Sequence, residues 1–193
     1  MKRVVLATSN PHKVEEINAV TKNMGIEFVL PPKGFDPVEN GKTFEENALI
    51  KAKEANKLTG MPSLADDSGL CVDALDGIPG IQSARYAKTQ DKRIERLLEE
   101  LKGVSQEKRG AKFVCAMVLV DKNGEVLFSD TGECFGSIGF GPKGKNGFGY
   151  DPVFILKNST KTMAELTEKE KNKISHRGQA LNRFIKFISH YSV

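Results

Sequence analysis

Two adjacent carboxylates, Asp66 and Asp67, are the side chains of this sequence that point most directly to chemistry. They follow a short apolar strand at residues 63–65 and precede residues 68–69 (Ser-Gly), which predict a turn. Acidic residues at the carboxyl end of a strand in an α/β sheet lie where ligands usually bind. Adjacent carboxylates also suit Mg2+, which takes few protein oxygens and keeps water and phosphate oxygens as its other ligands. The alternative is an Asx-type turn with both carboxylates in solvent, and Glu39, in a proline-containing loop, is a candidate third oxygen donor.

Basic residues in the first turn of a predicted helix indicate an anion site near the start of the chain. Residues 8–13 read Thr-Ser-Asn-Pro-His-Lys, in which the asparagine is the predicted N-cap and the proline the first helical residue. His12 and Lys13 therefore stand where the helix macrodipole favours negative charge. A phosphate bound by the exposed N–H groups of this turn would remove the conflict. Alternatively, Glu15 and Glu16 compensate for it, and Lys13 points into solvent.

The segment Ser175-His176-Arg177 repeats this pattern near the end of the chain. If a helix restarts at Ser175, both basic residues lie in its first turn. The alternative is one continuous helix from Glu168 that carries a solvated basic patch. Together with the acidic pair, the two basic helix starts favour a magnesium-dependent reaction on a phosphorylated ligand.

A glycine-rich stretch at residues 139–154 nearly matches two phosphate-binding signatures, G-x-G-x-x-G and G-x-x-x-x-G-K. Asn146 stands where a P-loop needs serine or threonine, and the glycines and proline that follow do not open a helix. Both signatures are therefore rejected. Two interpretations remain: a flexible surface loop, or a loop whose glycines let the backbone approach a ligand closely. The second would present Phe148 and Tyr150 as aromatic faces and Asp151 as an acceptor.

Strands and helices that alternate along the chain must position these groups. Short apolar runs predict strands, and capping boxes and apolar residues at helical spacing predict helices. The predicted strands are residues 3–7, 26–30, 112–120 and 126–134; the predicted helices start at residue 11, run over 43–58 and 91–101, and end the chain with Leu181, Phe184, Ile185 and Ile188 on one face. A hairpin turn is expected at 121–124 and a further capping box at 162–165. The pattern predicts one α/β domain over residues 1–193, with a mixed sheet because a hairpin sits among βα units.

Length, composition and charge exclude several classes of protein. The 193 residues, 39% hydrophobic and 28% charged, are typical of one soluble globular domain. No apolar run is long enough to span a bilayer, and the N-terminus lacks a signal-peptide pattern. The net charge of +4 permits an anionic ligand but does not predict a nucleic-acid-binding stripe. Three cysteines without C-x-x-C spacing predict buried free thiols and a reducing cytoplasm.

Seven segments, taken in order, resemble the inosine triphosphate pyrophosphatase family, also called the Ham1-like family of non-standard purine nucleotide pyrophosphatases. They are residues 8–13 (TSNPHK), 43–48 (TFEENA), 65–70 (ADDSGL), 77–86 (GIPGIQSARY), 147–152 (GFGYDP), 164–166 (AEL) and 175–177 (SHR). The ordered set covers nearly the whole chain and is far more specific than any one of its segments.

The resemblance implies hydrolysis of ITP, dITP and XTP to the nucleoside monophosphate and pyrophosphate, which keeps deaminated purines out of DNA and RNA. It implies an elongated α/β fold, in which a mixed β-sheet is flanked by helices and two lobes surround a central nucleotide-binding cleft. It also implies Mg2+ as the cofactor and a cytoplasmic homodimer whose partner is a purine nucleoside triphosphate rather than a nucleic acid or a membrane.

By position, the resemblance assigns catalysis to Asp67, which would accept a proton and bind magnesium together with Glu39. Substrate binding would fall to Thr8, Ser9, Asn10, Pro11, His12, Lys13, Ser68, Phe148, Gly149, Tyr150, Asp151, Lys171, His176 and Arg177. Among these, residues 8–13 would hold the triphosphate, and the others would line the nucleotide site.

Two other classes of protein remain open at this point. A pyrophosphatase for modified pyrimidine nucleotides would differ only in its base pocket, so a panel of substrates assayed with magnesium distinguishes it. A non-enzymatic nucleic-acid binder would use the basic helix starts, and a salt titration of DNA binding tests it. The small net charge of +4 argues against this binder.

Overall fold

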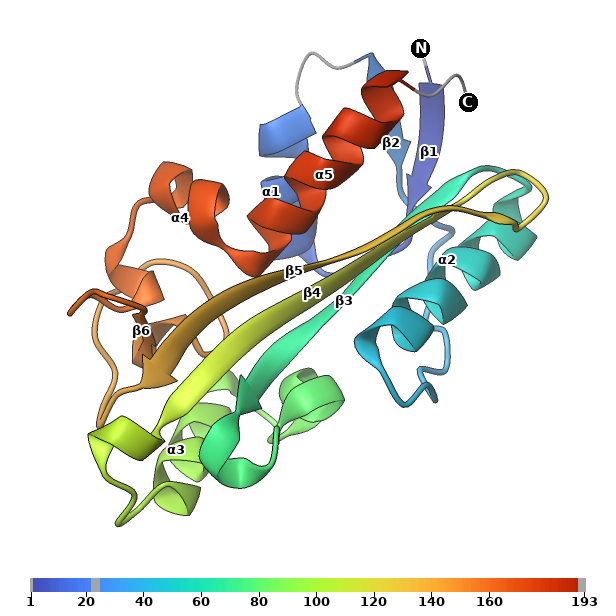
Figure 1. The fold of residues 1–193 in the computed structure, drawn as a ribbon. Coiled ribbons are helices and arrows are strands. Elements are labelled where there is room, and N and C mark those ends of the chain that lie inside the picture. Colours follow the sequence, from blue (N-terminus) through green and yellow to red (C-terminus); the bar gives the residue numbers. More distant parts are fainter. Residues whose placement is uncertain (1, 22–24, 191–193) are drawn as a thin grey trace. The chain divides into compact units, whose positions relative to one another are not determined.

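The computed structural model describes residues 2–21 and 25–190, with the backbone but not the side chains of Lys2, Pro11, His12, Glu16, Ala19 and Val20 (Figure 1). Within these residues, six strands form one sheet in the order β2-β1-β3-β4-β5-β6. Strand β1 (Lys2–Leu6) pairs in parallel with β2 (Ile26–Val29) and with β3 (Ser63–Val72). Strand β5 (Val126–Ile138) follows β4 (Gly110–Val120) and pairs antiparallel with β6 (Phe154–Leu156). The sheet is mixed, so this prediction is confirmed.

Helices connect the strands at the predicted places. The α-helices are α1 (Pro11–Thr21), α2 (Phe44–Thr59), α3 (Gln90–Glu100), α4 (Glu168–Ile174) and α5 (His176–His190). Short 3-10 helices are η1 (Asp73–Leu75), η2 (Gly80–Arg85), η3 (Gln106–Lys108), η4 (Asp151–Val153) and η5 (Met163–Glu165). No helix among the described residues is long and apolar enough to cross a membrane.

Helix α2 begins and ends as its capping residues predict. Thr43 Oγ1 accepts a hydrogen bond from Glu46 N–H at 3.1 Å, and Gly60 ends the helix with a φ of 68°. The predicted capping box is only half formed, because the Glu46 carboxylate accepts from Lys42 N–H rather than from Thr43 N–H. The box predicted at residues 162–165 is complete, but it opens the short η5 instead of an α-helix.

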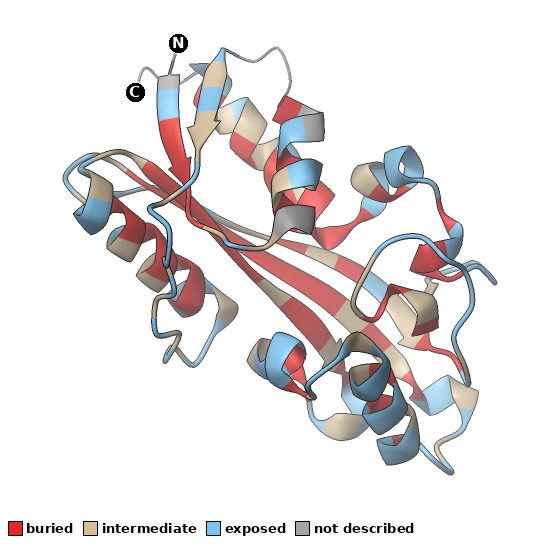
Figure 2. Cartoon of the chain, turned by 180° about the vertical axis from the view of Figure 1, so that it is seen from behind, coloured by how far each residue is buried: buried red, intermediate tan, exposed pale blue. Residues whose placement is uncertain are grey.

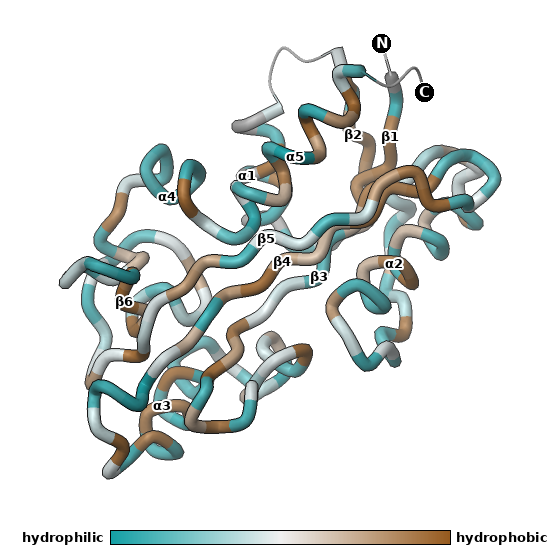
Figure 3. The backbone as a smooth tube through the Cα atoms, in the orientation of Figure 1, coloured by the Kyte–Doolittle hydropathy of each residue, from teal (hydrophilic) through white to brown (hydrophobic). Residues whose placement is uncertain are grey.

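The chain divides into two compact units. The first comprises Met1–Asp67, Cys115–Gly132 and Gln179–Val193, and the second comprises Ser68–Val114 and Glu133–Gly178. Strands β3, β4 and β5 each contribute residues to both units. Figure 2 shows the buried positions concentrated along the strands, with the helices buried mainly on one side. Figure 3 shows the same contrast in hydropathy, since β1 and β2 are largely hydrophobic and α4 is largely hydrophilic.

The first unit buries a different set of side chains on each face of its sheet, because successive strand residues point to opposite faces. Val4 and Leu6 pack with apolar residues of α1 and α5, whereas Val5 and Ala7 pack with α2. The buried residues that α2 contributes to this apolar packing are Ala48, Ala52 and Ala55. Alternation along the strand thus determines whether a side chain faces α1 or α2.

The second unit has its own hydrophobic core. Helix α3 contributes Ile94 and Leu97, β3 contributes Leu70 and Val72, and the loop before η4 contributes Tyr150. The amphipathic pattern predicted for residues 91–101 is therefore confirmed. This core holds α3 in a fixed position beneath the loop that carries the predicted aromatic residues.

Strand β3 differs from the prediction. We expected a strand to end at residue 65 and a turn to follow at 68–69, but β3 runs without interruption from Ser63 to Val72. The strand continues because Leu70 and Val72 are fully buried, and because both aspartates have donors that compensate for their burial. The predicted turn is therefore wrong, and so is the alternative of an Asx-type turn with both carboxylates in solvent.

The helix restart near the end of the chain is confirmed. Helix α4 ends at Ile174, and Ser175 adopts an extended conformation with φ −65° and ψ 156°. Its Oγ accepts from Gly178 N–H at 3.0 Å, which is the geometry of an N-cap. His176 and Arg177 therefore lie in the first turn of α5, and the continuous-helix alternative is wrong.

Candidate active site

The two aspartates of β3 have separate partners, because neighbouring strand residues point to opposite faces. Asp66 is 1% exposed, and its Oδ2 lies 2.9 Å from Lys13 Nζ and 3.7 Å from Cys115 Sγ. Asp67 is 8% exposed, and its Oδ2 accepts from Asn47 Nδ2 at 3.2 Å. A pair that looks uniform in sequence is thus two distinct carboxylates, one facing α1 and the other facing α2.

A buried lysine links Asp67 to Glu39. Lys51 Nζ lies 3.2 Å from Asp67 Oδ1 and 2.7 Å from Glu39 Oε1. Burial lowers the pKa of Lys51, but the carboxylates of Asp67, Asp66 and Glu39 outweigh this effect, so the pKa is raised above its usual value of 10.5. Lys51 is therefore protonated at neutral pH. One oxygen of Glu39 and one oxygen of Asp67 both contact its ammonium group.

The predicted phosphate segment forms the start of α1. Thr8 Oγ1 accepts from Asn10 N–H at 3.1 Å, and the helix begins at Pro11, as expected. Lys13 is only 9% exposed, so the prediction of a solvated lysine is wrong. Its partner is Asp66, to whose main-chain oxygen it also donates at 3.3 Å.

Three further residues of this segment were also predicted to hold the triphosphate. The side chains of Pro11 and His12 lie outside the described residues. Ser9 is exposed at the start of the helix. The backbone of the segment thus forms a helix N-terminus, which can bind an anion through its N–H groups. This conclusion does not depend on the side chains of Pro11 and His12.

The second unit holds another cluster of the predicted residues. Asp151 Oδ2 accepts from Phe148 N–H and from Lys171 Nζ, both at 2.9 Å. The Lys171 ammonium also lies 4.4 Å from the centre of the Phe148 ring. Asp151 and Lys171 are 3% and 6% exposed, so this is a buried ion pair with an aromatic ring beside it.

The first turn of α5 contributes the remaining cations. Arg177 is 2% exposed, donates to Ser68 Oγ at 2.9 Å, and lies 5.8 Å from the Phe148 ring centre. The His176 ring stacks on Phe113 with centroids 4.9 Å apart and an interplanar angle of 15°. The break at Ser175 makes this possible, since it turns the start of α5 toward these partners.

Residues 142–147 of the glycine-rich stretch lie at the surface, but two of its glycines are closely packed. A Cβ added at Gly144 would overlap the backbone of Ala164, and one added at Gly147 would overlap the Asp151 carboxylate. Both glycines have positive φ values, 84° and 72°. These two glycines therefore serve close packing against the chain itself, and Gly147 opens residues 147–151, which we call the aromatic loop.

The two aromatic residues of the aromatic loop differ in burial. Phe148 is half-buried, but Tyr150 is 4% exposed and belongs to the core of the second unit. The Tyr150 hydroxyl donates to Ser83 O at 3.0 Å, and burial raises its pKa. The prediction that Tyr150 offers an aromatic face is wrong, because its ring anchors the loop instead.

Comparison with known proteins shows which family this chain is similar to. Residues 4–187 match the model of the Ham1 family. The chain belongs to the Ham1 family. Curated relatives named dITP/XTP pyrophosphatase include one from Synechocystis sp., 45% identical over 96% of this chain and 94% of its own, and one from Bacillus subtilis, 46% identical over 97% and 98%. A solved HAM1 protein from Coxiella burnetii is 41% identical, covers 99% of this chain and 100% of its own, and superposes with a TM-score of 0.90.

This membership confirms the family predicted from the seven segments, and with it the α/β fold. Nucleotide pyrophosphatases of this kind generally need a divalent metal. Glu39 and Asp67 fit such an ion, because their oxygens already converge on a single cation, the Lys51 ammonium. No group of three or more histidine, cysteine, aspartate or glutamate side chains is placed to hold a metal among the residues that the structure describes.

Lys51 and Asn47 were not predicted as site residues. They lie four residues apart on α2, so they share a face of the helix, and both are buried. The signal was present in the sequence, since two polar residues fall beside the alanines that form the buried stripe of this helix. A helix that buries alanines together with a lysine and an asparagine needs a carboxylate to face them.

The three cysteines are described in full, and none forms a disulfide. Cys115 and Cys134 are buried, as predicted, but Cys71 is only half-buried. Burial raises the pKa of Cys134 to about 11 and also raises that of Cys71, so both remain thiols at neutral pH.

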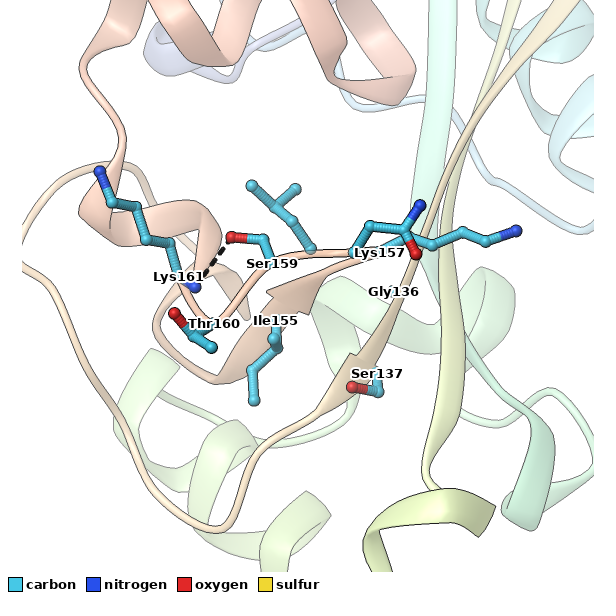
Figure 4. Close-up of a pocket in the computed structure, with 9 residues that line it drawn as sticks. Gly136, Ser137, Ile155, Lys157, Ser159, Thr160 and Lys161 are labelled. Atoms are coloured by element: carbon cyan, nitrogen blue, oxygen red, sulfur yellow. Dashed lines mark hydrogen bonds between the residues drawn. The ribbon is translucent and has the colours of Figure 1, made fainter.

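A surface pocket in the second unit does not coincide with these clusters. It has a volume of about 740 Å3 and is lined by β5, β6 and the loop that follows β6. Figure 4 shows that its two lysines, Lys157 and Lys161, extend in opposite directions. The pocket contains none of the predicted site residues, and its cations do not converge on a common ligand.

Proposed function

We propose that this chain hydrolyses dITP, XTP and ITP to the nucleoside monophosphate and pyrophosphate. The observation that carries the proposal is the buried arrangement of Asp67, Lys51 and Glu39 beside the helix start that contains Lys13. The names of the curated relatives support the choice of substrates. The physiological role that follows is removal of deaminated purine nucleotides before they enter DNA or RNA.

The first unit would act on the phosphates. Backbone N–H groups at the start of α1 bind phosphate oxygens, because they have no partners within the helix. Lys13 adds a positive charge at the same helix start, where it stabilises the leaving pyrophosphate. Asp66 holds the Lys13 side chain at 2.9 Å, so its ammonium is fixed before the substrate binds.

We propose Mg2+ as the metal and Glu39 and Asp67 as its protein ligands. Carboxylate oxygens are the ligands that magnesium prefers, and it uses one or two of them together with phosphate oxygens. When bound, the ion would neutralise the charge that develops on the phosphates and lower the pKa of water. Lys51 already occupies a position between the two carboxylates, so its ammonium limits their repulsion when no metal is present.

Asp67 would orient the attacking water and accept its proton. The water oxygen forms a bond to the α-phosphorus, the bond from that phosphorus to the bridging oxygen breaks, and pyrophosphate leaves with the electron pair. Asn47 and Lys51 each donate to one oxygen of Asp67, which fixes the plane of the carboxylate. A carboxylate held in a fixed orientation is suited to general-base catalysis.

The second unit would read the base. The half-buried Phe148 ring would stack on the base. Lys171 and Arg177, whose cationic groups lie 4.4 Å and 5.8 Å from the centre of this ring, would supply donors together with His176, and such donors suit the 6-oxo group of hypoxanthine and xanthine. Adenine would present an amino group to these donors. We therefore expect kcat/KM for ATP to be lower than that for ITP by a factor of about 10⁴–10⁵. GTP shares the 6-oxo group, and its penalty should be smaller.

We also propose a domain organisation, an oligomeric state and a compartment for this chain. Residues 1–193 would act as one functional domain, as a homodimer and in the cytoplasm. Size-exclusion chromatography with light scattering measures the oligomeric state directly.

One assay tests the proposed function. Purified full-length protein is incubated with dITP, XTP, ITP, GTP or ATP, and pyrophosphate and monophosphate are measured with Mg2+ and with EDTA. We expect magnesium-dependent release of pyrophosphate from the first three substrates. Release of inorganic phosphate without pyrophosphate, or equal rates with ATP and ITP, would contradict the proposal.

A further inference from the structure

We propose that Gln90 is a positioning residue that holds the aromatic loop in its binding conformation. Gln90 lies outside all seven segments that identify the family, at the first position of α3. Its Oε1 accepts from the backbone N–H of Gly149 at 2.7 Å. The inference rests on the proposed function, because it assumes that Phe148, next to Gly149, stacks on the substrate base.

Gln90 ties the aromatic loop to α3 at a point where its backbone is built from glycine. Gly147 and Gly149 flank Phe148, and their φ values of 72° and 64° lie in the left-handed region, which glycine can leave easily. A Cβ added at Gly149 would meet no atom within 4 Å, so the side of Gly149 on which a side chain would stand is open. The bonds between Phe148 and Asp151 hold the loop from within, with Phe148 N–H donating to Asp151 Oδ2 at 2.9 Å and Asp151 N–H donating to Phe148 O at 3.3 Å, and the hydrogen bond to Gln90 adds a tie to a helix outside the loop.

Gln90 is itself held firmly. Thr89 caps α3 by accepting from Lys92 N–H at 3.3 Å, and Ile94 and Leu97 bury the helix in the core of the second unit. At the other end of the loop, Tyr150 donates to Ser83 O from within the same core. Phe148 thus lies between two links to the core of the second unit, one through the Tyr150 ring and the other through the Gln90 side chain on α3.

The expected effect of removing this bond falls on substrate binding. Stacking on Phe148 acts equally on the bound substrate and on the transition state, so its loss should raise KM and leave kcat unchanged. A hydrogen bond of this kind corresponds to about a three- to tenfold change in affinity. Because the loop would contact the base, binding of pyrophosphate, which has none, should not change.

Three variants test the inference in the full-length protein. Gln90→Ala removes the acceptor, and Gln90→Glu keeps an oxygen at the same reach and is favoured by the helix dipole. Gln106→Ala is the matched control, since Gln106 donates to Ser137 Oγ at 3.2 Å in the same unit but does not touch the aromatic loop. KM and kcat are measured with dITP, and calorimetry gives the affinities for IMP and for pyrophosphate.

We expect Gln90→Ala to raise KM and weaken IMP binding by about three- to tenfold, with unchanged pyrophosphate binding. Gln90→Glu should restore both values, and Gln106→Ala should resemble the wild type. The inference is overturned if Gln90→Ala binds IMP normally, or if it loses IMP and pyrophosphate binding equally. A wild-type protein that releases no pyrophosphate from dITP, XTP or ITP would overturn the proposed function instead, and with it the premise of this test.

Discussion

Replacing Lys51 by methionine would test whether Glu39 and Asp67 form one cation site. Methionine nearly matches the length of the lysine side chain but carries no charge. In the wild type, the Lys51 ammonium lies 2.7 Å from Glu39 and 3.2 Å from Asp67. The variant would leave these two carboxylates on the first unit without the cation that they share.

The size of the effect follows from burial. Breaking a buried ion pair by removing one partner costs about 3–5 kcal/mol, because the remaining charge is left uncompensated. The Glu39 side chain keeps 19% of its exposure, so water screens part of the repulsion. We therefore expect a loss near the lower limit, about 3 kcal/mol, which corresponds to a fall in Tm of about 6–12 °C for a chain of this length.

Thermal unfolding in EDTA and in Mg2+ gives the measurement. Lys53→Met is the matched control, because Lys53 is an exposed lysine on the same helix. In EDTA, we expect the Tm of Lys51→Met to be well below the Tm of Lys53→Met. Mg2+ should raise the Tm of Lys51→Met and so reduce this difference, because the ion takes the place of the ammonium. Equal stability of the two variants in EDTA would refute the reasoning, and so would an absence of any magnesium effect on Lys51→Met.

The pH dependence of this difference is fixed by the direction of the pKa shift. The pKa of Lys51 is raised above 10.5, because the carboxylates outweigh the effect of burial. A group whose pKa is raised by folding contributes its full stability below the unfolded value and loses it as the pH rises through the folded value. The stability gap between wild type and Lys51→Met should therefore stay constant at neutral pH and shrink only above about pH 10.5.

Three further variants test the assigned roles. Asp67→Asn should lower turnover of ITP by about 10²–10⁴ while the fold survives, and near-normal turnover would remove Asp67 from the mechanism. Lys13→Ala should lower kcat/KM by about ten- to a hundredfold for every purine triphosphate, and it should also lower Tm because Asp66 loses its buried partner. Unchanged kinetics would contradict the phosphate role of Lys13. Arg177→Ala should narrow the ratio of ITP to ATP kcat/KM more than Lys13→Ala does, and an equal loss for ITP, GTP and ATP would show that Arg177 does not read the base.

Local signals predicted much of the fold correctly. The proline that starts α1, the caps of α2, and the restart of a helix after Ser175 all depend on a few neighbouring residues. Such signals act within one turn of helix, so they can be read from sequence without knowledge of the packing. The family was likewise predictable, since seven short segments keep their order over nearly the whole chain.

Predictions failed where burial by distant segments decided the outcome. The Asp66-Asp67 pair was predicted to precede a turn, because two carboxylates inside a buried strand need cationic partners. These partners, Lys13 and Lys51, lie 53 and 16 residues away in sequence, so the local sequence did not reveal them. Tyr150 looked like an exposed ring because its hydroxyl partner, Ser83 O, lies 67 residues away. In each case the missing information was which polar partner compensates for burial.

The alternation along β3 limits how this part of the chain can change in length. Asp66 must face Lys13 and Asp67 must face Lys51, and a shift of one residue in a strand moves every side chain to the opposite face. A single-residue deletion between Ser63 and Asp66 would therefore turn each carboxylate to the opposite face of the sheet, although both would remain in the sequence. Only length changes of even number keep each carboxylate on its own face, so the number of residues before the pair matters as well as their identity.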